Sequence, residues 1–248
     1  KQGGLSLLSY TYLRKMSFVL KLIEEGEHLN QDFKLRIDDS RKIAKTMAGF
    51  ANTDGGRLLI GVKDSGNVAG CNTSEEYHMI EAASNMYCRP AINFEIQVWK
   101  VGHLSVLEIK IPKSNSRPHF VEGVNDNGVI KWDAYIRRED RIHKANAVMV
   151  KVMQYQMRQE RSEFRYDIHV GNLFSAWREG RELRFVQVAK ISKMGFEEVE
   201  NLLALLIVWS IVRAKHSKRG YIYELADEEA MGKLETEGWQ VFRYKTVQ

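Results

Sequence analysis

The sequence contains little of what small stapled domains rely on. Only two cysteines, Cys71 and Cys88, occur in 248 residues, and their spacing matches neither a disulfide framework nor a zinc site. Only three prolines are present, and there is no low-complexity segment or internal repeat. The fold must therefore be held together by ordinary hydrophobic cores, and the chain is long enough for one large or two modest domains.

Long apolar runs are also missing. The longest, from Leu202 to Trp209, is far too short to cross a bilayer. The N-terminal segment lacks the charged and then apolar pattern of a secretory signal. The composition, 44% hydrophobic and 28% charged, is that of a globular protein. We therefore expect a cytoplasmic protein without a membrane partner.

The signatures of several enzyme classes are missing as well. No nucleophile elbow, phosphate-binding loop or dinucleotide-binding fingerprint occurs. The seven histidines show no metal-ligand spacing, and His119, beside Pro118, is interpreted as a surface or structural residue. We expect no cofactor, and function must come from charged surfaces or from carboxylates.

Hydrophobic periodicity predicts an α+β arrangement in the first part of the chain. Apolar residues at helical spacing predict helices over 13–25 and 40–51, and a capping box at Thr73 and Glu76 predicts a third helix. Strands are predicted over 28–35, 57–62, 92–98, 104–111 and 129–137. The alternation in 92–98 predicts a strand buried on one face. A mixed sheet with helices packed against it is expected.

The most specific segment runs from Phe50 to Gly61 and connects a predicted helix to a predicted strand. Gly55 and Gly56 supply the positive φ that a sharp reversal requires, and Asn52 can bond to nearby backbone. The segment follows a helix rather than opening one, so it lacks the positive helix end of a phosphate cradle. We interpret Asn52, Gly55 and Gly56 as a structural turn.

Several short motifs surround this turn in a characteristic order and spacing. They are Leu22-Ile-Glu-Glu-Gly-Glu27, Asp32-Phe33-Lys34, Gly61-Val-Lys-Asp64, Pro118-His119 and Ala134-Tyr-Ile-Arg137. Together they resemble the Schlafen-type AlbA-2 domain over about residues 20–145. The resemblance implies an AlbA-2-like mixed sheet and a role as a DNA-binding or regulatory protein. Some eukaryotic relatives are metal-dependent RNA endonucleases, so the resemblance also implies a nuclease alternative.

The second part of the chain has a different pattern. A long helix is predicted over 144–160, and helices over 183–190 and 196–209 are joined by a turn. Two strands are predicted on either side of Ser217-Lys218-Arg219-Gly220. This order resembles the winged-helix domains often found after AlbA-2 domains.

These patterns divide the chain into five expected regions. They are an N-terminal arm and helix start (1–20), an AlbA-2-like domain (21–143), a connecting helix (144–165), a winged helix-turn-helix domain (166–227) and a C-terminal tail (228–248). The boundary between the two domains is expected near residue 165. The tail is expected to add a helix and a strand over 239–245, without an assignable function.

Positive charge is concentrated in two segments. The formal net charge of +5 permits a polyanionic partner. In a DNA-binding winged helix the wing touches phosphate, and the predicted wing carries Arg213, Lys215, Lys218 and Arg219. A second basic strip carries Arg137, Arg138, Arg141 and Lys144. The structural alternatives are a solvated hairpin for the wing and pairing with nearby acids for the strip.

The helix predicted over 196–209 is poorly suited to reading bases. Its first turn carries glutamates at 197, 198 and 200, which phosphates would repel, although carboxylates also favour a helix N-terminus. Its core stripe leaves Leu205, Val208 and Trp209 partly outside, and exposed apolar groups of that size usually cover something. We therefore expect a dimer or interdomain surface here, and a homo-oligomer.

The nuclease alternative rests on Glu27, Asp32 and Asp64, with Lys34 nearby. Phosphodiester hydrolysis at a metal site needs oxygen ligands for Mg²⁺ or Mn²⁺. These positions match acids of the nuclease relatives, although Asp32 stands where the family has glutamate. The structural alternative pairs Asp32 with Lys34 and lets Asp64 cap its own turn.

The sequence thus favours a DNA-binding transcriptional regulator whose wing and basic strip contact phosphate. DNA is the expected partner, and RNA is a second polyanion that the same charges would attract. The first alternative is a divalent-metal-dependent endonuclease acting on RNA or DNA. The second is a dimerising assembly module without nucleic-acid contact.

Overall fold

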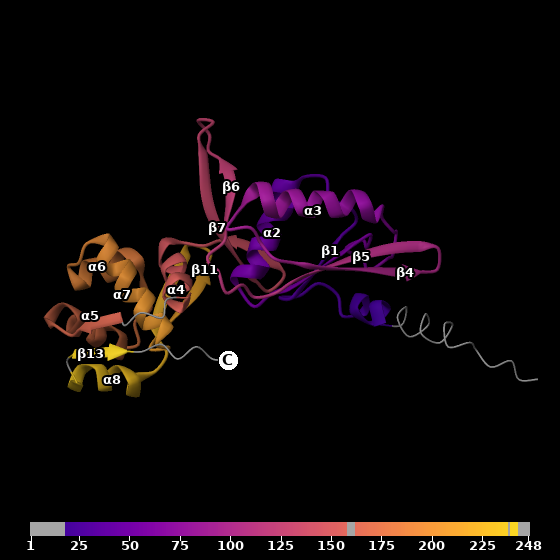
Figure 1. Ribbon diagram of the computed structural model, residues 1–248. Coiled ribbons are helices and arrows are strands. Elements are labelled where there is room, and N and C mark those ends of the chain that lie inside the picture. The colour runs from indigo at the N-terminus through magenta and orange to yellow at the C-terminus, as the bar shows by residue number, and fades with distance from the viewer. Residues whose placement is uncertain (1–17, 158–161, 238, 243–248) are drawn as a thin grey trace, which may run out of the picture. The chain divides into compact units, whose positions relative to one another are not determined.

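The structure, a computed structural model, describes residues 18–157, 162–237 and 239–242 (Figure 1). The chain divides into two compact units, the first ending at Ala145 and the second beginning at Asn146. The division falls before α4 (Ala147–Met157) and not after it, because α4 packs along α7 (Phe196–Val208) and contributes Val148 and Val152 to the core of the second unit.

The first unit contains two four-stranded sheets. In the sheet of order β1-β2-β5-β4, β1 and β2 are parallel and the other pairs are antiparallel. Its strands are β1 (Gln31–Lys34), β2 (Gly56–Ile60), β4 (Glu95–Val101) and β5 (Leu104–Ile111). The antiparallel sheet of order β3-β6-β7-β8 is built from β3 (Cys88–Arg89), β6 (Phe120–Val124), β7 (Ile130–Arg138) and β8 (Arg141–Lys144). The β6–β7 hairpin extends away from the rest of the unit (Figure 1).

Helices cover both faces of the β1-β2-β5-β4 sheet. α2 (Ser40–Asn52) begins at Asp39, whose side chain accepts hydrogen bonds from the first turn, and it packs with α3 (Thr73–Tyr87) on one face. Because side chains alternate along a strand, Leu58 points to that face while Leu59 points to the other. There Leu59 packs with a helix that includes residues 18–24.

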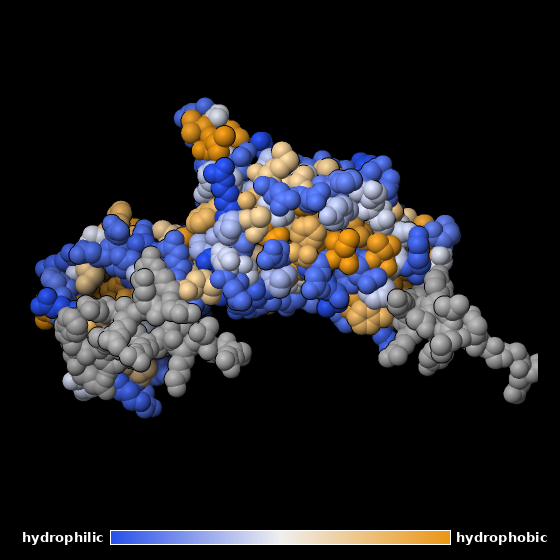
Figure 2. Space-filling view, in the orientation of Figure 1, coloured by the Kyte–Doolittle hydropathy of each residue, from blue (hydrophilic) through white to orange (hydrophobic). Residues whose placement is uncertain are grey.

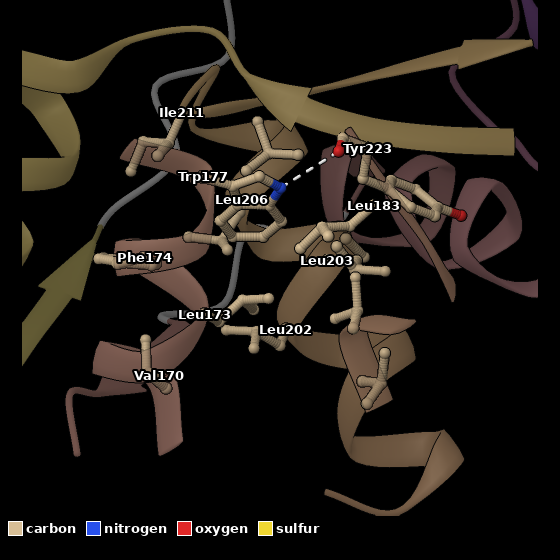
Figure 3. Close-up of a cluster of buried hydrophobic side chains, with 14 of the residues drawn as sticks. Val170, Leu173, Phe174, Trp177, Leu183, Leu202, Leu203, Leu206, Ile211 and Tyr223 are labelled. Carbon is tan, nitrogen blue, oxygen red and sulfur yellow. Dashed lines mark hydrogen bonds between the residues drawn. The ribbon is translucent and has the colours of Figure 1, made fainter. Parts of the chain in front are cut away.

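The second unit arranges helices around a three-stranded sheet of order β10-β12-β11. Its remaining elements are β9 (Ser162–Arg165), α5 (Ile168–Arg178), β10 (Leu183–Arg184), α6 (Phe185–Ser192), β11 (Val212–Ser217), β12 (Gly220–Leu225), α8 (Glu228–Glu237) and β13 (Trp239–Phe242). Figure 3 shows Trp177 of α5 lying against the leucines of α7, with its Nε1 donating a 3.1 Å hydrogen bond to the carbonyl of Tyr223. This core connects α5 and α7 to the sheet.

The predicted mixed α+β class is confirmed. The strand predicted over 104–111 is β5, and the helix predicted over 40–51 is α2, one residue longer. Several features differ from prediction. The sequence patterns did not predict the helix α5 or the strands β3, β6, β8 and β9. Ile96 and Val98 are 48% and 40% exposed because β4 lies at the edge of its sheet.

Some predictions lie outside the described residues, namely the N-terminal arm, the end of the helix predicted over 144–160 and the end of the strand predicted over 239–245. Within the described ranges, no helix has the length and apolar character needed to cross a bilayer.

Candidate nucleic-acid interface

The segment predicted as a basic wing is the hairpin of β11 and β12. The strands pair as far as Ser217 opposite Gly220, so Lys218 and Arg219 form the connecting turn. The Ser217 hydroxyl donates a 2.7 Å hydrogen bond to the carbonyl of Gly220, and Gly220 has a φ of 99°, which glycine adopts without strain. The turn therefore holds both cations exposed at the end of the hairpin.

The four predicted cations of the wing divide into two pairs. Arg213 and Lys215 flank the carboxylate of Glu224 on β12, each with a nitrogen 2.6 Å from one of its oxygens. The hydrogen bond from Lys215, helped by the one from Arg213, holds the pKa of Glu224 below its usual value. In the described part of the chain, neither Lys218 nor Arg219 has an ion-pair partner. The turn is therefore where the positive charge of the wing remains available.

The second helix of the predicted winged helix is α7, which packs along α4. Leu205 is only 8% exposed, and Val208 and Trp209 are half-buried against the core of the second unit. Trp209 packs edge-on against Phe164, with ring centroids 5.7 Å apart. The expectation that Leu205 lies partly outside the core is therefore wrong, whereas Val208 and Trp209 are partly exposed as expected. α4 of the same unit packs along this helix.

Side chains of α4 also form polar contacts with the N-terminal part of α7. The Nζ atom of Lys151 lies 2.8 Å from Oδ1 of Asn201 and 3.6 Å from the Glu200 carboxylate. The hydroxyl of Tyr155 donates a 3.0 Å hydrogen bond to the same Asn201 oxygen. These polar contacts fix α4 against α7, so the polar part of α7 serves the fold of the unit.

Arg137, predicted to contact phosphate, is buried, and its side chain is only 1% exposed. Its Nη1 lies 3.2 Å from Oδ1 of Asp32, and its Nη2 donates hydrogen bonds of 2.9 Å to the carbonyls of His28 and Gln31. Its guanidinium carbon lies 4.6 Å from the centroid of the Phe50 ring. Every one of these contacts is internal, so Arg137 cannot reach a phosphate while the unit is folded.

The rest of the predicted strip is largely neutralised. Lys144 pairs with Asp133 at 2.7 Å, and the exposed Arg141 lies 3.7 Å from its neighbour Asp140. Arg138 is half-buried and has interactions of its own. The pairing with nearby acids that the sequence offers as an alternative is thus present at Arg141 and Lys144, and the strip is not a continuous row of available cations.

The candidate nuclease residues lie on the outer edge of β1. The N–H of Phe33 donates a 2.8 Å hydrogen bond to the Glu27 carboxylate. Lys34 Nζ donates to the carbonyl of Phe33 at 2.7 Å and lies 2.5 Å from Asp32, the pairing that the sequence offers as the alternative. Glu27 and Lys34 therefore satisfy backbone groups that β2 does not reach.

Asp64 is exposed in the turn after β2. Among residues 18–157, 162–237 and 239–242, no group of three or more His, Cys, Asp or Glu side chains is arranged to hold a metal ion. The carboxylates of Glu27, Asp32 and Asp64 therefore form no such group in this fold.

The Asn52 turn has local bonds, from the N–H groups of Thr53 and Gly55 to the carbonyl of Phe50, and bonds to distant backbone groups as well. Asn52 is 5% exposed, its Nδ2 donates to the carbonyls of His119 and Tyr135 at 2.9 and 2.8 Å, and its Oδ1 accepts from the N–H of His119 at 2.7 Å. Gly55 has a φ of 73°, and a Cβ there would lie 2.8 Å from the carbonyl oxygen of Ile111. The end of α2 is thereby joined to both sheets.

His119, which the sequence leaves as a surface or structural residue, is 1% exposed. Its Nδ1 lies 2.8 Å from the carbonyl of Pro90 and its Nε2 lies 2.6 Å from the hydroxyl of Ser114. A neutral ring that donates from Nδ1 and accepts at Nε2 satisfies both contacts. Burial lowers the pKa of His119, which favours the neutral ring.

Comparison with known proteins gives a family match for the first unit and two similar solved structures. Residues 27–146 match the family model described as Schlafen, AlbA_2, which confirms the resemblance found in the motifs of this segment. Among solved structures, the N-terminal domain of a putative ATP-dependent DNA helicase RecG-related protein from Nitrosomonas europaea is 20% identical, with a TM-score of 0.38 over 50% of this chain and 87% of that one. The DIP2311 protein from Corynebacterium diphtheriae is 14% identical, with a TM-score of 0.41 over 86% of this chain and 38% of that one.

Proposed function

We propose that the protein is a DNA-binding transcriptional regulator that contacts phosphate with the turn between β11 and β12. The observation that carries the proposal is the exposure of Lys218 and Arg219 at the end of the β11–β12 hairpin, without ion-pair partners in the described ranges. Lysine and arginine side chains in such a position are the usual phosphate contacts of DNA-binding proteins. The Schlafen, AlbA_2 match over residues 27–146 also supports a DNA-binding role, since proteins that resemble this family are usually described as DNA-binding or regulatory.

We interpret the second unit as a winged-helix domain. In its favour is the order of elements, in which α5, β10, α6 and α7 precede the β11–β12 hairpin and the sheet has order β10-β12-β11. α7 is covered by α4 and begins with glutamates, so base reading by this helix is not expected. Binding led by the wing depends on phosphate, is steeply salt-dependent and has modest sequence preference.

The proposal is tested by replacing both turn residues. A Lys218→Ala/Arg219→Ala variant is expected to bind a labelled DNA duplex about a hundredfold more weakly at about 50 mM salt, because each phosphate contact releases condensed counterions. A matched Lys63→Ala/Lys110→Ala variant removes the same charge from exposed positions of the first unit and is expected to keep most of the affinity. Fluorescence anisotropy measures both.

Two outcomes would overturn the assignment to DNA. If the wild-type chain binds no duplex at about 50 mM salt, the wing is a solvated hairpin. If an RNA competitor of equal length displaces the DNA at a much lower concentration than unlabelled DNA does, RNA is the partner and the regulatory assignment fails.

A further inference from the structure

The two outer edges of the β1-β2-β5-β4 sheet differ in how their backbone groups are satisfied. At the β1 edge, the carbonyl of Gln31 accepts from Arg137, the N–H of Phe33 donates to Glu27, and the carbonyl of Phe33 accepts from Lys34. Side chains therefore occupy the groups through which another strand could pair. The β1 edge is closed within a single chain.

The β4 edge is long and largely open. β4 has seven residues and ends the sheet, and in the described part of the chain no strand pairs with its outer side. Gln97 donates a 2.9 Å side-chain hydrogen bond to the carbonyl of Val98, so that carbonyl faces away from β5. Because backbone direction alternates along an antiparallel strand, the backbone groups of Ile96 and Lys100 face outward as well.

Two of the exposed side chains on this edge strand are apolar, whereas an edge strand is normally protected by charged ones. Ile96 and Val98 are 48% and 40% exposed, and Figure 2 shows an apolar area below α3, over the β4–β5 strands. The Lys100 side chain is directed toward β5, where its Nζ lies 2.6 Å from the Ser105 hydroxyl, and so it does not block pairing of another strand at the outer side of β4. Exposed apolar strands with open backbone groups are sites of strand addition.

A second copy of β4 fits this edge in one particular register. In a two-fold symmetric antiparallel pair, opposite residues share a face, so their numbers must have a constant even sum. A pair centred on Gln97 places Ile96 opposite Val98 of the second copy and Val98 opposite its Ile96. These residues direct their backbone groups outward, as hydrogen-bonded partners must.

The two neighbouring registers, centred on Val98 and on Ile96, fit the strand less well. A pair centred on Val98 would pair all seven residues of β4 but would place both copies of the exposed Ile96 against Lys100, whereas a pair centred on Ile96 would leave only residues 95–97 of β4 in contact. In the register centred on Gln97, Glu95 faces Trp99 of the second copy and Lys100 faces Phe94, so no like charges meet. The strand is therefore self-complementary in both its side chains and its backbone.

We propose that the protein is a dimer in which β4 pairs with β4 of a second copy, joining the two sheets into one continuous sheet. The partner strand takes the place of the Gln97 amide at the Val98 carbonyl. This surface replaces α7 as the origin of the expected homo-oligomer, and the proposal is independent of nucleic-acid binding.

Sedimentation velocity of the full chain is expected to give a dimer at micromolar concentration. Val98→Lys places a charge at the exposed edge and is expected to shift the population to monomer, with an unchanged circular dichroism spectrum. The matched control Met86→Lys alters an exposed apolar residue of α3, 65% exposed, and is expected to remain a dimer. A monomeric wild-type chain, or a Val98→Lys variant that stays dimeric, would overturn the proposal.

The register is tested by cross-linking in a Cys71→Ser background, in which the buried Cys88 remains. Gln97→Cys lies opposite its own counterpart and is expected to form an intermolecular disulfide rapidly. Glu95→Cys lies opposite Trp99 and is expected to form one at least tenfold more slowly. Equal rates for the two variants would overturn the pairing centred on Gln97.

Discussion

The basic strip of the first unit and the wing of the second are similar in sequence and opposite in structure. Arg137, in the strip, is buried and bonded to Asp32 and to the start of β1. Lys218 and Arg219, in the wing, are exposed at the end of a hairpin. The difference follows from position, because β7 ends beside the backbone carbonyls of His28 and Gln31, which accept from Arg137. Among the described residues, no acid pairs with Lys218 or Arg219.

The comparison indicates that a cluster of cations remains available to a partner only where the fold leaves its charges unpaired. Even within the wing, Glu224 occupies Arg213 and Lys215 and leaves the turn as the available part. A buried arginine that satisfies carbonyls should therefore control stability, and an exposed one should control binding.

The largest effect is expected from Arg137→Met. The variant leaves Asp32 with a single cation and leaves the carbonyls of His28 and Gln31 without the donor that Arg137 provides. The free energy of unfolding of the first unit is expected to fall by about 3–5 kcal/mol. Hydrogen exchange of β1 and β2 peptides across a denaturant series measures this change.

The matched control is Arg141→Met, which removes an exposed arginine from the same strip. Its expected effect is below about 0.5 kcal/mol. Equal losses of unfolding free energy in the two variants would show that the burial of Arg137 does not make it more important for stability than Arg141.

A pH-dependent effect is expected at His119. Burial, with the nearby Arg117 charge, lowers the pKa of His119 in the folded state from its ordinary value of 6.5. As pH falls through that value, the unfolded chain takes up a proton that the folded chain does not, so stability present at neutral pH is lost. His119→Gln is expected to flatten the pH dependence of unfolding between neutral and mildly acidic pH. A profile that is identical in both proteins would contradict this account.

A smaller effect is expected from Lys151→Met, which removes the cation between α4 and α7. Without its bonds to Asn201 and Glu200, the free energy of unfolding of the second unit is expected to fall by about 1 kcal/mol. Faster hydrogen exchange in α7 would show that α4 protects this helix. Lys190→Met, at an exposed position on α6, is the control and is expected to leave α7 exchange unchanged.

The smallest effect is expected from Glu224→Gln. The variant removes the carboxylate that neutralises Arg213 and Lys215, so the wing gains available positive charge. DNA affinity is expected to rise about three- to tenfold at low salt. Unchanged affinity would mean that only the turn touches phosphate, which would narrow the contact surface to Lys218 and Arg219.

Local patterns predicted much of the fold. The strand at β5, the helix at α2 and the basic hairpin all follow from alternation, helical spacing and turn residues within a short window. α5 carries the same kind of signal, because Asp167 precedes Val170, Phe174 and Trp177 at helical spacing, and this signal could have identified the helix.

The errors at the candidate sites have a different cause. Arg137 meets Asp32, which lies 105 positions away in the chain, and Lys151 meets Asn201, which lies 50 positions away. The hydrophobic periodicity around Arg137 or Lys151 cannot predict contacts with residues so far away in the chain. Burial of a charged residue and coverage of an apolar helix face therefore had to come from the tertiary structure.

The most direct test of the account is the slope of log Kobs against log salt for duplex DNA. For Lys218→Ala/Arg219→Ala the slope is expected to become shallower by about two, one for each phosphate that the turn no longer neutralises. For Arg141→Ala/Lys144→Ala, in the strip, the wild-type slope is expected. A wild-type slope in the wing variant, together with a shallower slope in the strip variant, would contradict the division of roles between the two segments.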